Sequence, residues 1–364
     1  MKVPVVVAGL VVIVLGASPA IAATPQRTLV QRLQAAIARQ VKDGVPGVVV
    51  HVVDPARRLD WHGAAGRFAR GKPRPLRSGD AFRTASVTKT FTAAVVLRLA
   101  EQGRLGLDDP IARFLDPAVV ARVDVVDGVP HGGEITVREL LNHTSGLYDY
   151  TDDSAYTRAR IARPGRVWQP RQLVTIAVRH KPLFRPGSDW AYSNTNYVLL
   201  GLVAEAVTSR SLVDELRSRI FRPLGLSSTA YPLGTTLGGR VVHGYVRSIP
   251  GVPIPRGRAL DVTARVAPNG WGAGQIVSNA GDLTRFYAGL LGGRLLPPPQ
   301  LAAMKIAVRG RTRCSARRSS SRRRTGSASR SSGSAVGRPT VTSATFPATA
   351  IWSGPAPTGA ASRR

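Results

Sequence analysis

Apolar residues recur at intervals of three or four positions in several parts of the chain, a spacing that predicts amphipathic helices. One apolar stripe near the N-terminus consists of Leu29, Leu33, Ile37 and Val41. A second stripe, in the middle of the chain, consists of Tyr197, Leu200, Val203 and Val207. The same reasoning predicts helices within residues 82–103, 136–146, 212–226 and 281–295.

A different pattern fills residues 44–66, "GVPGVVVHVVDPARRLDWHGAAG". Short runs rich in valine on either side of Asp54-Pro55 predict two strands joined by a turn. Two strands followed by a mostly helical middle indicate an α+β protein whose sheet lacks further strands.

The first residues have the pattern of an export signal. Lys2 precedes an apolar run, and Ala20-Ile21-Ala22 offers a small-x-small cleavage site, so residues 1–22 are predicted to be a signal peptide. An uncleaved membrane anchor is the alternative, although the apolar run is short for a membrane span. We therefore expect a secreted or cell-envelope protein with no stable membrane span after cleavage.

The formal net charge of +30 is divided between the body and a C-terminal segment that carries +12. Residues 309–364 contain 12 of the 51 basic residues, 12 serines and no acidic residue, without apolar periodicity. This composition predicts a disordered basic tail. GC-rich genes that are read out of frame encode sequences of this composition. We therefore interpret the tail as the product of a frameshift, with an in-frame disordered tail as the alternative.

Composition also excludes several classes of protein. The single cysteine, Cys314, allows no intrachain disulfide and lies in the tail, so a thiol enzyme of any usual design is excluded. The basic body suits an anionic cell envelope. No aromatic residues or reading helix accompany the basic residues, so we expect no nucleic-acid partner.

The candidate chemistry begins at Ser86-Val87-Thr88-Lys89. On a helix, positions i and i+3 share a face, so the lysine amine lies beside the serine oxygen. A partly buried lysine could lower its own pKa, or hold a second base ionised, and thereby activate the serine as a nucleophile. The alternative interpretation is that Ser86 only caps the helix.

A second motif, Tyr192-Ser193-Asn194, precedes the middle helix. The tyrosine could accept the serine proton if Lys89 lowers its pKa. The Asn194 amide could donate to a substrate carbonyl and hold Lys89 through its oxygen. As isolated residues, these two would be a packed ring and a turn residue.

With both motifs in view, the chain resembles the penicillin-recognising serine hydrolases, in the branch of the Streptomyces-type D-Ala-D-Ala carboxypeptidase and the class C β-lactamases. The shared text includes "FRTASVTKTFTAAVVLRLAEQGRLGLDDPIARFL", "ITVRELLNHTSGLYDYT" and "PGSDWAYSNTNYVLLGLVAE". The resemblance implies a β-lactamase/transpeptidase-like fold over residues 23–308, with an antiparallel sheet flanked by helices and an all-helical lobe.

The resemblance also implies roles for individual residues. Ser86 would be the nucleophile, Tyr192 the general base, Lys89 the group that tunes both, and Asn194 a substrate-binding amide. The implied protein is an exported D,D-carboxypeptidase-type hydrolase that forms an acyl-enzyme with D-Ala-D-Ala peptides or β-lactams. We expect a monomer that needs no metal or other cofactor.

The chain departs from the family at its third motif. An H-T-G or K-T-G strand is expected after Met304, but none occurs, and Thr325-Gly326 imitates only two of its letters. Without the C-terminal strands, the strand at 48–53 is expected to show an open edge and an exposed apolar face. The sequence therefore predicts an incomplete domain that folds poorly or is nearly inactive.

Several alternatives remain open. A class C-like β-lactamase, an esterase or a D-amino-acid amidase could use the same fold, and a non-catalytic peptidoglycan-binding protein is the alternative from another class. Thr151 and Trp271 are predicted to contact substrate, although Trp271 could simply pack. The Tyr150 phenol is expected to border the cleft, and His143 to be structural.

Overall fold

The computed structural model describes residues 26–123, 125–126, 129–163, 165–234, 241–247, 254–255, 257–263, 270–309 and 343–344. The predicted signal peptide, residues 1–22, lies outside the described residues. Of the predicted tail, only Arg309 and Ser343–Ala344 are described. Both predictions therefore stay predictions.

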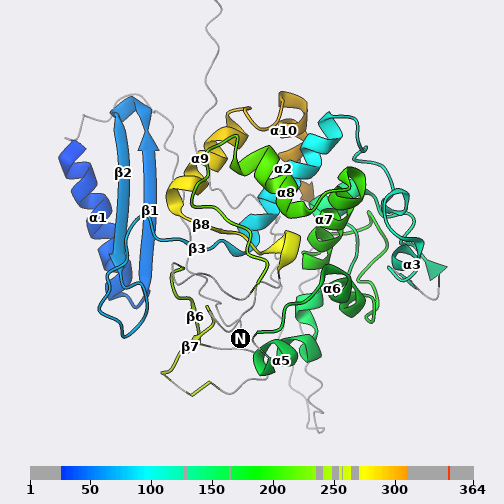
Figure 1. The fold of residues 1–364 in the computed structure, drawn as a ribbon, viewed down its shortest axis with the longest axis horizontal. Helices are drawn as coiled ribbons and strands as arrows, with labels where there is room; N and C mark the ends of the chain where they lie inside the picture. The colour runs from blue at the N-terminus through cyan, green and yellow to red at the C-terminus, as the bar shows by residue number, and fades with distance from the viewer. Residues whose placement is uncertain are drawn as a thin grey trace, which may run out of the picture.

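A β-hairpin and one helix form the N-terminal part of the fold. Strands β1 (Gly47–Asp54) and β2 (Leu59–Gly66) pair antiparallel, joined by a 3₁₀ turn at Pro55–Arg57. Helix α1 (Gln26–Lys42) lies along one face of the hairpin (Figure 1). Its predicted apolar stripe packs there against Val50 and Val52. The hairpin, its turn and the first helix are thus confirmed as predicted.

The opposite face of the hairpin packs on the rest of the molecule. Val49 contacts Leu76 and also Ala280, the first residue of helix α9 (Ala280–Leu291). Within the described ranges, β1 pairs with β2 alone. The expectation of an exposed apolar face is wrong, because Val49, Val50 and Val52 are all buried between α1 and the body.

A hollow of about 150 Å³ lies beside the first half of β1. Gly47, Val48 and Val49 line one side of it, and Phe82 and Val242 contribute to the remaining wall. The open edge predicted for β1 therefore adjoins a partly apolar recess.

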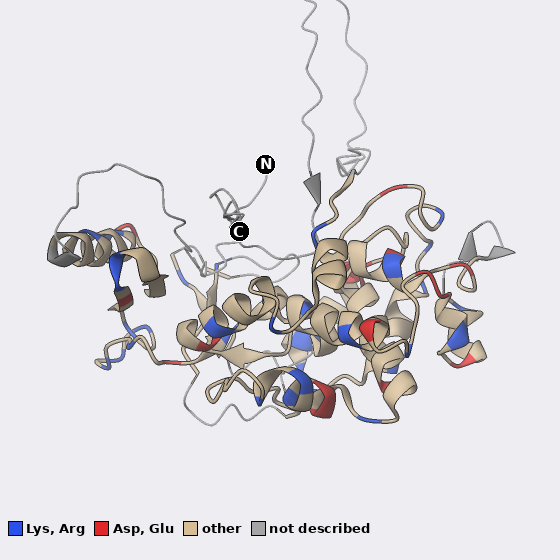
Figure 2. Ribbon diagram, turned by 90° about the horizontal axis from the view of Figure 1, so that it is seen from above, with Lys and Arg blue, Asp and Glu red and all other residues tan. Residues whose placement is uncertain are grey.

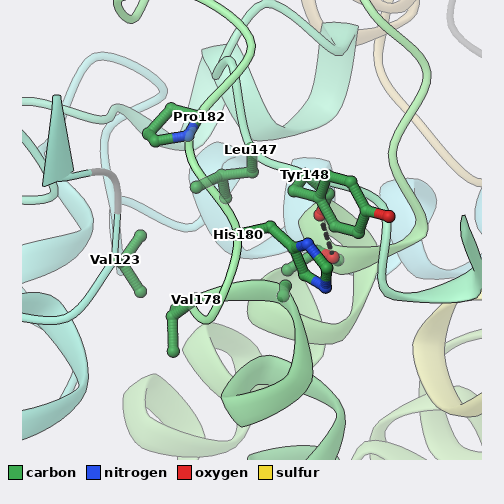
Figure 3. Close-up of a pocket in the computed structure, with 8 residues that line it drawn as sticks. Val123, Leu147, Tyr148, Val178, His180 and Pro182 are labelled. Carbon is green, nitrogen blue, oxygen red and sulfur yellow. Dashed lines mark hydrogen bonds between the residues drawn. The ribbon is translucent and has the colours of Figure 1, made fainter. Parts of the chain in front are cut away.

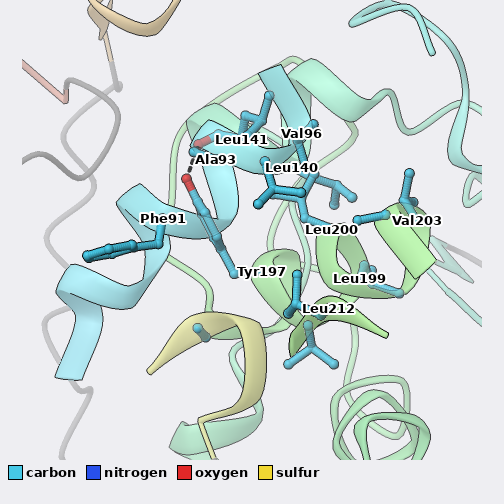
Figure 4. Close-up of a cluster of buried hydrophobic side chains, with 14 of the residues drawn as sticks. Phe91, Ala93, Val96, Leu140, Leu141, Tyr197, Leu199, Leu200, Val203 and Leu212 are labelled. Atoms are coloured by element: carbon cyan, nitrogen blue, oxygen red, sulfur yellow. Dashed lines mark hydrogen bonds between the residues drawn. The ribbon is translucent and has the colours of Figure 1, made fainter. Parts of the chain in front are cut away.

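The helical body is built around two long helices, α2 (Thr88–Glu101) and α7 (Asn194–Thr208). Their buried residues form one cluster, shown in Figure 4, in which Tyr197 donates a hydrogen bond to the carbonyl of Leu141 at 3.0 Å. Because α2 is apolar almost all round, it is buried on nearly every side. The turn that carries Ser86 is therefore attached to a helix whose side chains are almost all buried.

Shorter elements complete the body. The other helices are α3 (Pro117–Val120), α4 (Val137–Asn142), α5 (Ser154–Ala162), α6 (Pro170–Ala177), α8 (Leu212–Leu216) and α10 (Pro298–Met304). The two-residue strand pairs are β3 (Phe82–Arg83) with β8 (Val277–Ser278), β4 (Val125–Val126) with β5 (Val129–Pro130), β6 (Tyr245–Val246) with β7 (Leu260–Asp261), and β9 (Val308–Arg309) with β10 (Ser343–Ala344). The helix predicted within residues 136–146 is α4, for which Thr136 is the N-cap and Glu139 completes a capping box.

Charged residues of both signs are interspersed along the ribbon of the body, as Figure 2 shows. Many of them pair, as Arg138 does with Asp108 at 2.6 Å. In the part of the chain that is described, none of the helices combines the length and apolar character needed to cross a membrane.

Candidate active site

Ser86 lies in a 3₁₀ turn, Ala85–Val87, directly before α2. The preceding residue, Ala85, has a φ of +46°, a left-handed conformation that is uncommon outside glycine. The Ser86 side chain is exposed, and neither the turn nor α2 has a side-chain cap. The capping interpretation of Ser86 is therefore wrong, because its hydroxyl points to other partners.

Lys89 lies one turn further on and is completely buried. Its amine contacts three oxygen atoms: Ser86 Oγ at 3.2 Å, Asn194 Oδ1 at 2.7 Å and the carbonyl of Ala273 at 2.8 Å. Three acceptors match the three hydrogens of an ammonium group. A neutral amine fits equally well, since it would donate to two of them and accept from the Ser86 hydroxyl.

Tyr192 completes the contacts of the serine. Its hydroxyl lies 2.8 Å from Ser86 Oγ, and its side chain is 37% exposed. The ring packs 4.6 Å from the ring of His143, whose Nδ1 accepts a hydrogen bond from the Ser193 backbone at 3.2 Å. His143 thus supports the tyrosine loop without touching Ser86, as expected for a structural residue.

The electrostatics of this group differ from one sequence expectation. Burial lowers the pKa of Lys89 to about 7, against an opposing effect of the nearby Asp149 charge. Burial also raises the pKa of Tyr192 to about 12, although its hydrogen bond with Ser86 acts the other way. The pKa of Tyr192 is therefore raised rather than depressed in the resting site; of the two ways that a lysine could assist, the structure favours a lowered pKa of Lys89 itself.

Asn194, the first residue of α7, connects Lys89 to a residue that the sequence did not reveal. Its Nδ2 donates to Asp149 Oδ2 at 2.8 Å and to Thr151 Oγ1 at 3.3 Å. The predicted contact of its oxygen with Lys89 is confirmed. Both amide hydrogens are engaged, however, so donation to a substrate carbonyl requires one of these bonds to be exchanged.

Asp149 is buried, and its other carboxylate oxygen accepts from the backbone and hydroxyl of Thr151, both at 2.9 Å. Its negative charge acts on Lys89 and raises the pKa of the amine. The only sequence signal was an acidic residue placed between two tyrosines in "GLYDYT". Nothing in that pattern indicates a contact with Asn194, which lies 45 residues further along the chain.

Three further residues, Trp271, Tyr150 and Thr151, were predicted to lie at the site. Trp271 packs against the core, and a Cβ on Gly201 of α7 would come 2.4 Å from its ring, so its substrate role stays a prediction. The Tyr150 phenol is 1% exposed and packs edge-on against Tyr156, so it does not border a cleft. Thr151 joins the site through Asn194.

A separate small hollow, shown in Figure 3, lies beside the stacked rings of Tyr148 and His180. Its volume of about 10 Å³ is enough for a single water molecule. None of the predicted site residues lines it, so it adds no substrate space around Ser86.

Comparison with known proteins places the chain among serine hydrolases. A family model described as Beta-lactamase matches residues 28–341. The chain is 29% identical over 255 residues to penicillin-binding protein 4 of Amycolatopsis lactamdurans, covering 68% of this chain and 62% of that protein. It spans only 34% and 45% of the lengths of two further curated relatives.

Solved structures give longer matches. A D-stereospecific amidohydrolase from Streptomyces sp. is 38% identical, with a TM-score of 0.66 and coverage of 78% of both chains. The D-amino acid amidase of Ochrobactrum anthropi SV3, complexed with D-phenylalanine, is 30% identical, with a TM-score of 0.67 and coverage of 76% of this chain and 75% of that one.

Proposed function

The chain belongs to the beta-lactamase family of serine hydrolases, and from this premise we propose that it cleaves amide bonds of D-amino-acid substrates through an acyl-enzyme on Ser86. The observation that carries the proposal is the contact of Ser86 Oγ with both Lys89 Nζ and Tyr192 OH. A nucleophile with a base and a proton donor in hydrogen-bond reach is the arrangement that acyl transfer needs.

In the proposed acylation, Ser86 gives its proton to the neutral amine of Lys89 and bonds to the carbonyl carbon. A pKa of about 7 leaves a substantial fraction of this amine unprotonated near neutral pH. The amide C–N bond then breaks, and the leaving nitrogen receives the phenolic proton of Tyr192.

Deacylation reverses these proton transfers. A water molecule gives a proton to the Tyr192 phenolate while its oxygen attacks the acyl carbon, and Ser86 departs with the proton held by Lys89. The lysine ammonium, 4.8 Å from the centre of the tyrosine ring, stabilises the transient phenolate. Tyr192 thus serves as general base in this half of the reaction alone, whereas the family resemblance implies that it also takes the Ser86 proton during acylation.

The substrate proposal rests on the amide chemistry of the relatives. The 38% identical structure is a D-stereospecific amidohydrolase, which supports a D-amino-acid amide or peptide as substrate. A D-Ala-D-Ala carboxypeptidase is the second candidate, supported by a relative from Escherichia coli O157:H7 that is described as a putative D-alanyl-D-alanine carboxypeptidase and is 28% identical over 204 residues. We further propose that the protein acts as a monomer outside the cytoplasm, because residues 1–22 have the pattern of an export signal.

The proposed activity is low for the sequence as it stands. No H-T-G or K-T-G motif follows Met304 to supply a second oxyanion donor. Loss of one such donor costs roughly 10²–10³ in rate in other acyl-transfer enzymes. Slow acylation is therefore expected even though Ser86, Lys89 and Tyr192 are in place.

A trapping experiment tests the proposal. The full chain is incubated with a fluorescent penicillin, and the labelled peptide is mapped by mass spectrometry. Slow labelling of Ser86 is expected, absent in Ser86→Ala and retained in Ser188→Ala, which alters another exposed serine. Labelling that persists in Ser86→Ala contradicts the proposal, and binding to peptidoglycan unaffected by that substitution supports a non-catalytic binding protein instead.

The substrate class is tested separately. Ammonia release from D-phenylalanine amide, without release from the L-enantiomer, supports the amidase proposal, whereas D-alanine release from a D-Ala-D-Ala peptide supports the carboxypeptidase. Fast turnover of nitrocefin identifies a β-lactamase, and hydrolysis of p-nitrophenyl acetate alone identifies an esterase. Fast, stoichiometric penicillin labelling contradicts the proposed low activity.

A further inference from the structure

Two histidines and an aspartate gather on the hairpin, on the face away from α1. The strand register places His51 of β1 directly opposite His62 of β2. Asp60 lies two residues before His62 and so projects from the same face of the strand. The two imidazole rings stack with their centres 3.9 Å apart and their planes 12° apart.

The three side chains converge on one point. Asp60 Oδ1 lies 2.7 Å from His51 Nε2 and 3.2 Å from His62 Nε2. The three candidate ligand atoms all lie within 4.8 Å of one another. In a tetrahedral zinc site, with bonds near 2.0–2.2 Å, ligand atoms are separated by about 3.3 Å. The separations of 2.7 and 3.2 Å are close to this value, and coordination requires the two stacked rings to turn so that both nitrogens face the ion.

The surroundings give this cluster a rigid base and an open side. His51 is 7% exposed, while the side chains of His62 and Asp60 are 48% and 68% exposed. Beneath the rings lies Gly281 in the first turn of α9, where an added Cβ would come 3.8 Å from His62 and 4.0 Å from His51. A cation can thus enter from solvent, and water can complete its coordination.

We propose that His51, Asp60 and His62 form a binding site for a divalent transition-metal cation, of which Zn²⁺ is the best match. Two imidazole nitrogens and one carboxylate oxygen are a ligand set that suits zinc, copper and nickel rather than calcium or magnesium. The bound ion crosslinks β1 to β2 opposite the start of α9. Its role is to hold the hairpin, not to take part in the chemistry at Ser86.

The affinity is expected to be moderate. Nδ1 of His51 is buried and has no hydrogen-bond partner among the described residues. A metal-bound histidine normally donates its other N–H to an acceptor, and loss of such a partner costs about 10–100-fold in affinity. The site therefore binds zinc more weakly than a closed structural zinc site does.

The test is a zinc titration of the untagged full chain, made metal-free and monitored by competition with a chromophoric chelator. One Zn²⁺ per chain is expected, with a rise in Tm on adding zinc, since binding to the native state alone stabilises it. His62→Asn and Asp60→Asn should each weaken binding by at least about 10-fold. Both side chains are largely in solvent, and circular dichroism verifies that the variants fold.

His180→Asn is the matched control, because His180 pairs with Asp153 at 2.8 Å but lacks a third ligand within the described residues. It should bind zinc like the parent chain. A cobalt spectrum typical of tetrahedral coordination, lost in His62→Asn, gives a second readout. The proposal is overturned if the parent chain binds no zinc at 1 mM, or if His62→Asn binds it as tightly as the parent.

Discussion

At the scale of single residues, Lys89 is the group on which the site depends. Its amine is fully buried, which disfavours its charge, yet it has three oxygen neighbours that can satisfy an ammonium group. Only the bond with Ser86 needs to change direction when the proton leaves. The surroundings therefore accept both protonation states without rearranging, which suits a group that takes and returns a proton.

The first prediction concerns the pH dependence of acylation. Because burial lowers the pKa of Lys89 to about 7, the neutral amine accumulates as pH rises through that value. The rate of Ser86 labelling should increase through pH 7 and then level off. Lys89→Arg, which keeps a proton at every usable pH, should show almost no labelling. A rate independent of pH between 5 and 9 contradicts this assignment.

A second prediction concerns Asp149. Its negative charge raises the pKa of Lys89, against the effect of burial. Asp149→Asn keeps an oxygen for the Asn194 amide but removes the charge. The rise in the rate of Ser86 labelling with pH should therefore begin at a lower pH. Labelling reactions quenched at set times over a series of pH values measure this shift. A rise that begins at the same or a higher pH would show that Asp149 does not act on Lys89 electrostatically.

At the scale of elements, α2 connects Ser86, the proposed nucleophile, to the core. Phe91, one turn beyond Ser86, is fully buried, and its ring stacks on Phe286 of α9 with centres 3.6 Å apart. Thr92 of α2 donates at 2.8 Å to the carbonyl of Gly272, beside the Ala273 carbonyl that binds Lys89. Packing of Phe91 therefore holds the helix that carries Lys89, and the Thr92 hydrogen bond holds the turn whose Ala273 carbonyl contacts its amine.

The third prediction is that Phe91→Ala lowers the free energy of unfolding by about 3–5 kcal/mol, because it removes a buried ring and leaves a cavity. Denaturant unfolding measures the loss. Leu291→Ala is the control on α9, since Leu291 is 39% exposed and its truncation should cost far less. Equal losses in the two variants would mean that α2 and α9 are not packed as described.

At the scale of the whole molecule, the body is joined to the hairpin through α9 and the loop around Leu76, while the site lies at the start of α2 and α7. Buried polar residues such as His143 connect the loops around the site to this core. Their protonation therefore affects the stability of the whole fold and not only the local geometry.

The fourth prediction follows from His143. Burial first, and then the Lys89 charge, lowers its pKa from 6.5 to about 3. The unfolded chain therefore takes up a proton that the folded one does not, and stability present above pH 6.5 is lost as pH falls toward 3. The loss from this group amounts to roughly 4 kcal/mol.

Urea unfolding between pH 3 and 7 measures how the free energy of unfolding falls with pH. His143→Asn is the informative variant, because asparagine tolerates the left-handed backbone at this position, where φ is +66°. The variant should lose stability less steeply on acidification than the parent chain does. A parallel decline in both proteins would contradict a buried, neutral His143.

The sequence by itself determined the hairpin, the longest helices and the central pair of motifs. Apolar periodicity is a local property, so α1, the hairpin and α7 were found close to their observed bounds. The i, i+3 spacing fixed Ser86 beside Lys89, and Tyr192 with Asn194 followed from a motif with family resemblance.

Only the tertiary structure decided what surrounds those motifs. Asp149 and the Ala273 carbonyl reach Lys89 from loops far away in the chain, and no local pattern encodes such contacts. The direction of the Tyr192 pKa was mispredicted for the same reason, since burial depends on packing and not on neighbouring charges in the sequence. Likewise His51 and His62 meet only because the strand register places them opposite each other.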